Sequence, residues 1–220
     1  MTAPRAILFD FGGTLDADGV AWKDRFRSMA GVTGPSERFD RAYYAADDAL
    51  VGTIPRHLTF RETVDRLSHN LVRELGWEEN RAEAIADAFF ETSRSKAEAN
   101  REILEQLSRR FRLGIVSNFY GNLEQVCEDF GISRHVGVMV DSAVVGFEKP
   151  DPRIFRAALA ALDIPAEQAV FVGDSLPRDM QGARGLGMAH VYVSPAEDAA
   201  SCCPGDPVIH SVDWLLGMYA

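Results

Sequence analysis

The chain has 220 residues, the length of one ordinary domain or of one domain that carries a modest insertion. A hydrophobic content of 46% and a charged content of 25% are typical of a globular protein with a buried core. The formal net charge of −10 argues against a protein that binds nucleic acid or an anionic membrane, because both partners require a basic face. No apolar run approaches the length of a membrane span.

Short apolar runs bounded by polar or turn residues predict buried strands at 6–9, 113–116, 136–140, 169–173 and 190–194. Amphipathic helices are expected between them at about 120–130, 152–162 and 179–187. The helix over 152–162 begins with Asp151 as its cap and Pro152 in its first turn. Strands that alternate with helices predict an α/β fold, a doubly wound parallel sheet covered on both faces.

Residues 17–96 depart from this alternation, because their apolar residues follow helical spacing. Thr59 and Glu62 form a capping-box pattern, and Gly76 marks the end of the helix that follows. Further helices are expected after Ser36 and around Ile85. We therefore predict that an all-helical cap, residues 17–96, is inserted into a core formed by residues 1–16 and 97–220.

Polar residues stand where the predicted strands end. In a parallel α/β sheet, ligands bind beyond the carboxyl ends of the strands, so these residues are expected to meet at one edge. The residues are Asp10, Ser117 with Asn118, Asp174 with Asp179 nearby, and Lys149, which precedes the helix before the fourth strand.

This set of side chains suits phosphoryl transfer. Carboxylates gathered at one point repel one another unless a cation lies between them, and hard oxygen ligands favour Mg²⁺. A carboxylate can attack phosphorus and form an aspartyl-phosphate. A hydroxyl and a lysine would then hold the transferring oxygens and balance their charge.

Four motifs in order, "DFGGTL", "IVSN", "KPDPRIF" and "VGDSLPRDMQGA", resemble those of the haloacid dehalogenase-like hydrolase superfamily. The resemblance covers about residues 5–16 and 100–195, and the helical insert resembles that family's cap. It implies that Asp10 is the nucleophile, with Ser117 and Lys149 as further catalytic residues. The implied Mg²⁺ ligands are Asp10, the backbone carbonyl of Gly12, Asp174 and Asp179, and the implied substrate contacts are Thr14, Ser117, Asn118 and Lys149.

Gly12 departs from the phosphatase pattern of this family, in which a second aspartate two residues after the nucleophile protonates the leaving oxygen and later activates water. Positioned acid–base catalysis contributes about 10²–10⁴-fold, so the loss is costly. Asp16 or Asp18 can substitute, or the substrate has a good leaving group, as acyl and aryl phosphates do. Two other reactions lack that aspartate: phosphonate hydrolysis through a Schiff base on a cap lysine, here Lys23, and metal-free dehalogenation.

The sequence thus predicts a Mg²⁺-dependent hydrolase of a small phosphorylated metabolite that acts through an aspartyl-phosphate on Asp10. The alternatives are a catalytically weakened binding protein of the same fold and a hydrolase of phosphonates or other C–X bonds. Residues that can line a substrate pocket from the cap are Trp22, Tyr43, Tyr44, Arg56 and His57.

The cysteines and histidines suggest no further site. Three cysteines, including the adjacent Cys202 and Cys203, form no disulfide framework and no zinc spacing, which favours a cytoplasmic location. The adjacent pair is interpreted as an inert loop pair, with a vicinal disulfide as the alternative. The five histidines show no paired i, i+4 spacing, so none is predicted to bind a metal.

Overall fold

Six strands form one sheet in the order β3-β2-β1-β4-β5-β6, and each pair of neighbours is parallel. The computed structural model describes residues 4–203 and 205–219. The strands are β1 (Ala6–Phe9), β2 (Arg112–Ser117), β3 (Val138–Asp141), β4 (Ala169–Gly173), β5 (Ala189–Val193) and β6 (Val208–Ile209). The predicted doubly wound parallel sheet is confirmed, and the two-residue strand β6 was not expected from the sequence.

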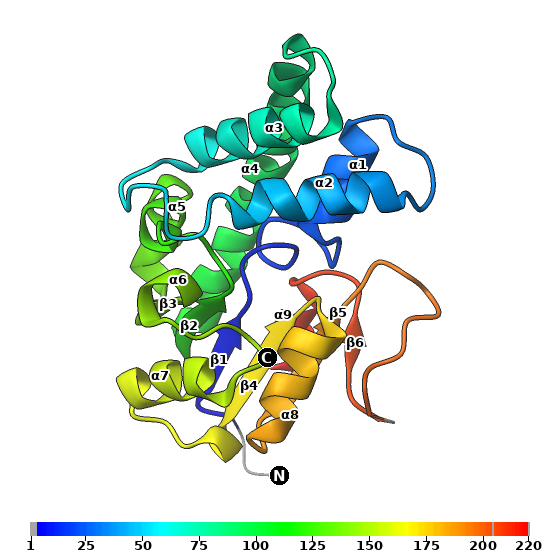
Figure 1. The fold of residues 1–220 in the computed structure, drawn as a ribbon. Helices are drawn as coiled ribbons and strands as arrows, with labels where there is room; N and C mark the ends of the chain where they lie inside the picture. Colours follow the sequence, from blue (N-terminus) through cyan, green and yellow to red (C-terminus); the bar gives the residue numbers. More distant parts are fainter. Residues whose placement is uncertain (1–3, 204, 220) are drawn as a thin grey trace.

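The helices connect these strands (Figure 1). They are α1 (Trp22–Met29), α2 (Glu37–Asp48), α3 (Phe60–Leu75), α4 (Asn80–Ser108), α5 (Leu123–Asp129), α6 (Ser142–Val145), α7 (Pro152–Leu162), α8 (Gln181–Gly185) and α9 (Trp214–Met218). Short 3₁₀ turns lie at Ser133–His135 and Ala166–Gln168, and a π-helical turn lies at Leu176–Met180. Among the described residues, no helix is both long enough and apolar enough to cross a membrane.

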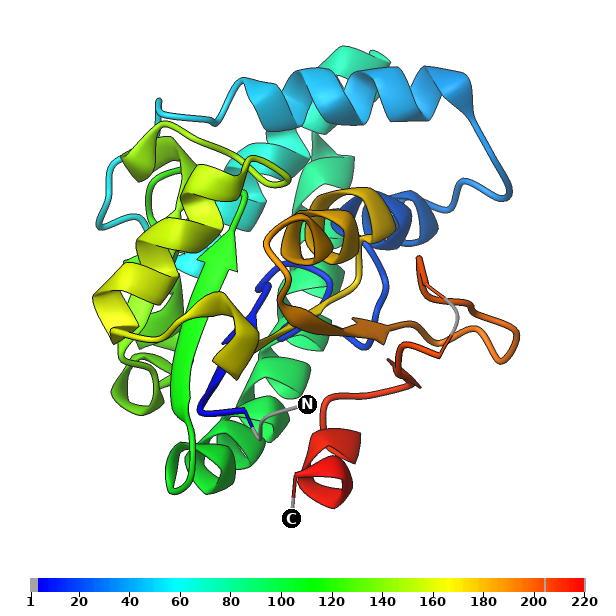
Figure 2. The same ribbon diagram turned by 90° about the horizontal axis from the view of Figure 1, so that it is seen from below.

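The sheet has a core on each face, because successive side chains along a strand point to opposite sides. Ile7 and Phe9 of β1 belong to one hydrophobic cluster, together with residues of α4, α5 and α9. Leu8 belongs to the other cluster, whose helices are α7 and α8. Figure 2, viewed from below, shows these helices on opposite sides of the strands. Burial on both faces explains why the strands are continuous apolar runs.

Strand β1 lies between β2 and β4 in the middle of the sheet. Its last residue, Phe9, is in register with Ile115 of β2 and Val172 of β4. The chain then leaves toward the helical insert, comes back as β2 on one side of β1, and later forms β4 on the other side. The residues that follow the ends of these three strands are therefore neighbours, although they are far apart in sequence.

Helices α1 to α4 lie together beyond the end of the sheet to which β1 leads (Figure 1). The predicted capping box of Thr59 and Glu62 begins α3, and Gly76 ends it in the left-handed conformation. Helix α4 is longer than expected, because its 29 residues run through the predicted boundary between residues 96 and 97. One continuous helix therefore begins in the insert and ends against the core, where it leads into β2.

Candidate active site

Asp10, Ser117 and Lys149 form the centre of the candidate site. Asp10 follows β1, and its Oδ1 accepts a hydrogen bond from the Ser117 hydroxyl at 2.8 Å. The same oxygen lies 2.7 Å from the Lys149 ammonium nitrogen. All three residues are buried. One carboxylate oxygen of Asp10 is thus held by two donors, which fixes the orientation of the group.

The backbone beside Lys149 is held by Asn118, which follows β2. The Asn118 side-chain amide donates to the Lys149 carbonyl at 3.1 Å, and its Oδ1 accepts from the Lys149 amide at 2.7 Å. This reciprocal pair joins the segment after β2 to the segment before α7. Asn118 therefore positions Lys149, in addition to lining the cavity described below.

Asp179 is the second carboxylate that pairs with Lys149, at 2.7 Å from Oδ1 to Nζ. It is fully buried in the π-helical turn, and its Oδ2 accepts from the Ser175 amide at 3.0 Å. Burial raises the pKa of Asp179 to about 6, although Lys149 opposes the shift. Burial lowers the pKa of Lys149, but the attraction of Asp10 and Asp179 outweighs it, and the pKa is raised.

Asp174 is the third carboxylate and follows β4 directly. Thr14 is fully buried, and its hydroxyl donates to Asp174 Oδ1 at 3.3 Å, which supports the orientation of Asp174. Thr14 is not among the described residues that line the cavity described below. Gly13 is required here, because its φ is +94° and a Cβ would lie 2.4 Å from Asp174 Oδ2. Burial and the negative charge of Asp10 and Asp179 raise the pKa of Asp174 well above its usual range.

The three carboxylates suit a divalent cation. Asp10, Asp174 and Asp179 each offer an oxygen atom, and these atoms all lie within 4.8 Å of one another. Lys149 pairs with Asp10 and Asp179, and Asp174 adds a third carboxylate, so negative charge exceeds positive charge when all three are ionised. An all-oxygen donor set of this kind favours Mg²⁺. Gly12, the fourth predicted ligand through its carbonyl, lines the same cavity.

The space above Gly12 is occupied by the indole of Trp22. A Cβ at position 12 would lie 3.2 Å from Trp22 Nε1 and 3.5 Å from Cε2. The backbone of Gly12 does not have a positive φ, so conformation does not require glycine here. The glycine instead leaves room for a buried tryptophan that belongs to the insert.

Asp16 is engaged in a buried network and has no exposed surface. Its Oδ2 accepts from Trp22 Nε1 at 2.8 Å and from Ser93 Oγ at 3.1 Å, and it forms an ion pair with Arg25 at 2.7 Å. Its Oδ1 accepts from the Gly13 amide at 2.7 Å. A carboxylate held by four donors is not free to protonate a leaving group. Asp16 therefore organises the loop after β1 and anchors α1 and α4 to it.

Asp18, the other candidate for a substitute acid, and Lys23, the candidate for a Schiff-base lysine, are each paired with a residue of opposite charge. Asp18 pairs with Lys96 of α4, which holds it at the junction of insert and core. Lys23 lies 3.0 Å from Asp40. Burial lowers the pKa of Lys23, but the hydrogen bond from Lys23 to Asp40 and nearby negative charge raise it overall. A Schiff-base lysine requires a lowered pKa, so this environment argues against that role.

These residues line a cavity of 470 Å³ between the sheet edge and the helical insert. The core contributes Asp10, Gly12, Ser117, Asn118, Lys149, Asp174 and Asp179, and the insert contributes Trp22, Lys23, Tyr43, Tyr44 and Asp47. Of the pocket residues expected from the sequence, Arg56 and His57 are not among the described residues that line this cavity. Tyr120 and Arg178 line it as well. Tyr120 donates its hydroxyl to Asp47 and so links the core to the insert.

Comparison with known proteins agrees with this arrangement. The family model of the haloacid dehalogenase-like hydrolases matches residues 4–187. A phosphoserine phosphatase from Thermus thermophilus is 35% identical over 205 residues, 86% of this chain and 81% of that protein. Two solved structures share the fold. A dehalogenase with an intermediate complex has a TM-score of 0.69 at 19% identity, covering 100% of this chain and 99% of that chain. A Bacillus subtilis hydrolase, YfnB, has a TM-score of 0.60 at 20% identity, covering 99% of each chain.

Proposed function

The chain belongs to the haloacid dehalogenase-like hydrolase family, and we propose that it hydrolyses small phosphorylated molecules through a phosphoryl group carried by Asp10. The observation that carries the proposal is the pairing of Asp10 with Ser117 and Lys149 beside two further carboxylates. A nucleophilic carboxylate requires donors that fix its orientation. The transferring phosphoryl group requires positive charge at the same point.

The first step uses the carboxylate oxygen of Asp10 that Ser117 and Lys149 do not hold. This oxygen attacks phosphorus, an O–P bond forms to Asp10, and the bond from phosphorus to the ester oxygen breaks. The leaving group departs with that oxygen as an anion, a carboxylate from an acyl phosphate or a phenolate from an aryl phosphate, and takes up a proton from solvent where its basicity requires one. Lys149 and Ser117 bind the phosphoryl oxygens during the transfer, which stabilises the developing charge.

The second step returns the enzyme to its starting state. A water molecule attacks phosphorus, the bond to Asp10 breaks, and inorganic phosphate leaves while Asp10 regains its carboxylate. Mg²⁺ bound by Asp10, Asp174, Asp179 and the Gly12 carbonyl would supply charge neutralisation at the phosphoryl group. The YfnB structure described above is reported bound to magnesium, which supports the same cation here.

The substrate class follows from position 12. Gly12 offers no carboxylate, Asp16 is held by partners, and Asp18 pairs with Lys96 and is not among the described residues that line the cavity. The leaving group is therefore one that departs as a stable anion, as in an acyl or aryl phosphate. The related phosphoserine phosphatase acts on an alkyl ester, by its name, so phosphoserine is the natural comparison substrate.

The insert serves as the cap that selects the substrate. It places Trp22, Tyr43 and Tyr44 on the cavity, and these aromatic rings favour a planar or apolar leaving group. Lys23, Asp47 and the exposed Arg178 add charges of both signs around the same opening. A site lined in this way suits a small polar metabolite rather than a macromolecule.

The proposal is tested by kcat/KM for acetyl phosphate, p-nitrophenyl phosphate, phosphoserine and glycerol phosphate, each with Mg²⁺ and with EDTA. We expect Mg²⁺-dependent turnover that is fastest for the first two compounds. Asp10→Asn, which is nearly isosteric, should abolish turnover while the circular dichroism spectrum is retained. No turnover of any ester by wild-type protein that still binds phosphate with Mg²⁺ would instead identify a binding protein of this fold.

A further inference from the structure

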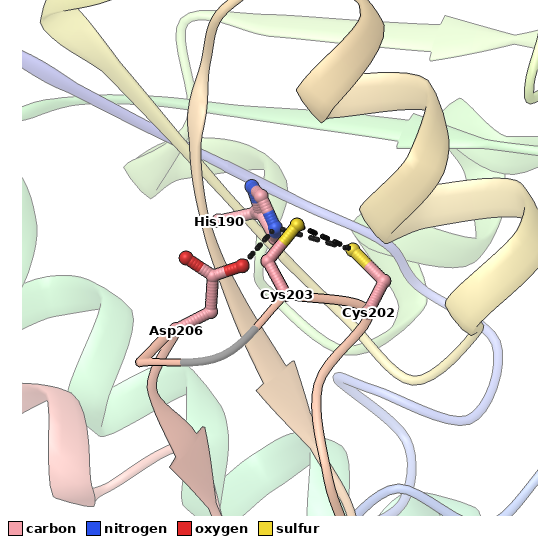
Figure 3. Close-up of side chains that lie close together, drawn as sticks. All are labelled: His190, Cys202, Cys203 and Asp206. Carbon is pink, nitrogen blue, oxygen red and sulfur yellow. Dashed lines mark hydrogen bonds and ion pairs between the residues drawn. The ribbon is translucent and has the colours of Figure 1, made fainter.

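A second group of metal-ligating side chains lies at the edge of the sheet that carries β5 and β6. His190 belongs to β5, and Cys202, Cys203 and Asp206 belong to the segment that connects β5 with β6. One donor atom from each residue lies within 4.8 Å of the other three. Figure 3 shows the imidazole, both sulfur atoms and the carboxylate pointing toward one another. We propose that these four residues bind one Zn²⁺ ion.

The spacing of the donor atoms agrees with a single tetrahedral ion. Two sulfurs bound to one Zn²⁺ at about 2.3 Å lie about 3.8 Å apart, and the Cys202 and Cys203 sulfurs are 3.7 Å apart. A sulfur and an imidazole nitrogen bound at usual lengths lie about 3.5 Å apart, and Cys202 Sγ is 3.5 Å from His190 Nε2. Of these three separations, the 2.8 Å between His190 Nε2 and Asp206 Oδ2 is shorter than a shared ion requires.

The imidazole of His190 is oriented for metal binding through Nε2. Its Nδ1 lies 3.2 Å from the Met188 carbonyl, an acceptor that requires the proton to be on Nδ1. In the neutral ring the Nε2 lone pair then faces the nearby donor atoms, and because Nε2 lies 2.8 Å from Asp206 Oδ2, a proton or a cation must lie between these two atoms. A backbone acceptor behind a ligating histidine is the usual support for its orientation. His190 is also buried, which excludes competing water from most of its surface.

The chemistry of the donors distinguishes this group from the catalytic cluster. Two thiolates and an imidazole prefer a borderline-soft cation such as Zn²⁺, whereas the three carboxylates of the catalytic cluster prefer Mg²⁺. Four protein ligands complete a tetrahedron and leave no open position for substrate. The ion is therefore structural. It joins the β5–β6 connection to β5, beside the two-residue edge strand β6.

The sequence did not predict this site, because the spacing of its four residues matches no recognised zinc motif. The expectation that no histidine binds a metal competes with the zinc proposal at His190, whose ring lies close to three other possible ligands. The interpretation of Cys202 and Cys203 as an inert pair competes directly with the zinc proposal. The vicinal disulfide is a third state, and the 3.7 Å between the sulfurs is far from the bonded distance of about 2.05 Å.

The test measures zinc bound by the reduced, EDTA-treated full chain after dialysis against Zn²⁺ with excess Mg²⁺ to fill the carboxylate cluster. We expect one Zn²⁺ per chain by mass spectrometry of the metal. We also expect the intense visible spectrum of a tetrahedral site with thiolate ligands when Co²⁺ replaces Zn²⁺. Cys202→Ser with Cys203→Ser should weaken binding by far more than tenfold, since even indirect partners of a metal site contribute about 10–100-fold.

Further variants separate a lost ligand from a lost fold. Asp206→Asn and His190→Gln should each weaken zinc binding while circular dichroism and Mg²⁺-dependent turnover show a folded protein. The matched controls are Cys127→Ala and His210→Gln, a cysteine and a histidine outside the cluster, and both should retain one Zn²⁺. Asp174→Asn should also retain it, which excludes binding at the carboxylates.

Three results would overturn the proposal. One is a wild-type chain that binds no zinc at micromolar free Zn²⁺, and another is full binding by the double serine variant. The third is a Cys202–Cys203 disulfide in protein whose thiols are alkylated at the moment of cell lysis.

Discussion

The indole of Trp22 fills the space into which a side chain at position 12 would project, with Nε1 3.2 Å from the place of a Cβ on Gly12. The same N–H donates to Asp16, which is paired with Arg25. Trp22 thus connects the two features: it takes the space of a side chain at position 12, and it belongs to the buried network around Asp16. An aspartate cannot be restored at position 12 without moving the tryptophan.

The first prediction concerns this pair of residues. Gly12→Asp alone should raise turnover of alkyl phosphates only slightly, because Trp22 crowds the new side chain. In the double variant Gly12→Asp with Trp22→Phe, kcat/KM for alkyl esters should rise further, by at most about 10²–10⁴-fold. Aryl esters should gain much less, because their leaving group needs little protonation. The measurement is kcat/KM for glycerol phosphate and p-nitrophenyl phosphate.

Gly12→Asn with Trp22→Phe is the matched control, since it adds the same bulk without an acid. Equal gains for both esters, or equal gains with the asparagine, would show that proton donation at position 12 is not what limits the enzyme.

The second prediction separates Asp16 from Asp18. Asp16→Asn should lower the free energy of unfolding by about 3–5 kcal/mol, because it leaves the buried Arg25 without its charged partner. Asp18→Asn should cost only about 0–1 kcal/mol, because its pair with Lys96 is partly exposed. Urea unfolding curves of the two variants make the comparison. If Asp18→Asn abolishes turnover without loss of stability, Asp18 is the substitute acid, and our account of position 12 fails.

The third prediction concerns pH and the carboxylate cluster. In metal-free protein the pKa of Asp179 is about 6, above the value of about 3.9 in an unfolded chain. The folded state therefore holds this proton more tightly, and its stability falls as pH rises from about 4 to about 6. Mg²⁺ held as proposed would bind the ionised carboxylates, so its stabilising effect should increase over the same range.

Melting temperatures in EDTA and in Mg²⁺, measured from pH 4.5 to pH 7.5, test this dependence. Asp179→Asn should make the fall in EDTA shallower without removing it, because the pKa of Asp174 is also raised. A stabilisation by Mg²⁺ that does not change with pH would place the bound ion elsewhere.

The fourth prediction concerns Lys23 and phosphonate hydrolysis. Because Lys23 is paired with Asp40 and keeps its charge, Lys23→Arg should retain most of the turnover of phosphate esters. Borohydride added with phosphonoacetaldehyde should not reduce a Schiff base onto the wild-type chain. A stable adduct that maps to Lys23 and is lost in Lys23→Arg would favour the phosphonate reaction.

Local patterns in the sequence predicted the parts of the fold that depend on neighbouring residues. The capping box of Thr59 and Glu62, the left-handed Gly76 and the Asp151–Pro152 start of α7 all occur as predicted. The residues after β1, β2 and β4 meet because β1 lies in the middle of the sheet, a consequence of parallel topology that the alternation of elements already implied.

Features that depend on tertiary contacts could not be predicted from local sequence patterns. The sequence offered Asp16 as a substitute acid, but its partners Arg25 and Ser93, which engage it, come from α1 and α4. No local pattern places Trp22 above Gly12. His190 meets Cys202 only because the β5–β6 connection folds back on β5. The length of α4 was also missed, because its polar residues continue the helix past the expected boundary of the insert.

The most direct test of the central claim is chemical trapping of the phosphoryl group on Asp10. Protein turning over acetyl phosphate or p-nitrophenyl phosphate with Mg²⁺ is quenched, and borohydride then reduces any acyl phosphate to an alcohol. Peptide mass spectrometry identifies the converted residue. Our account predicts conversion of Asp10 to homoserine, dependent on substrate and Mg²⁺, and its absence in Asp10→Asn. Turnover that proceeds with Asp10 unmodified, or conversion of a different carboxylate, would contradict it.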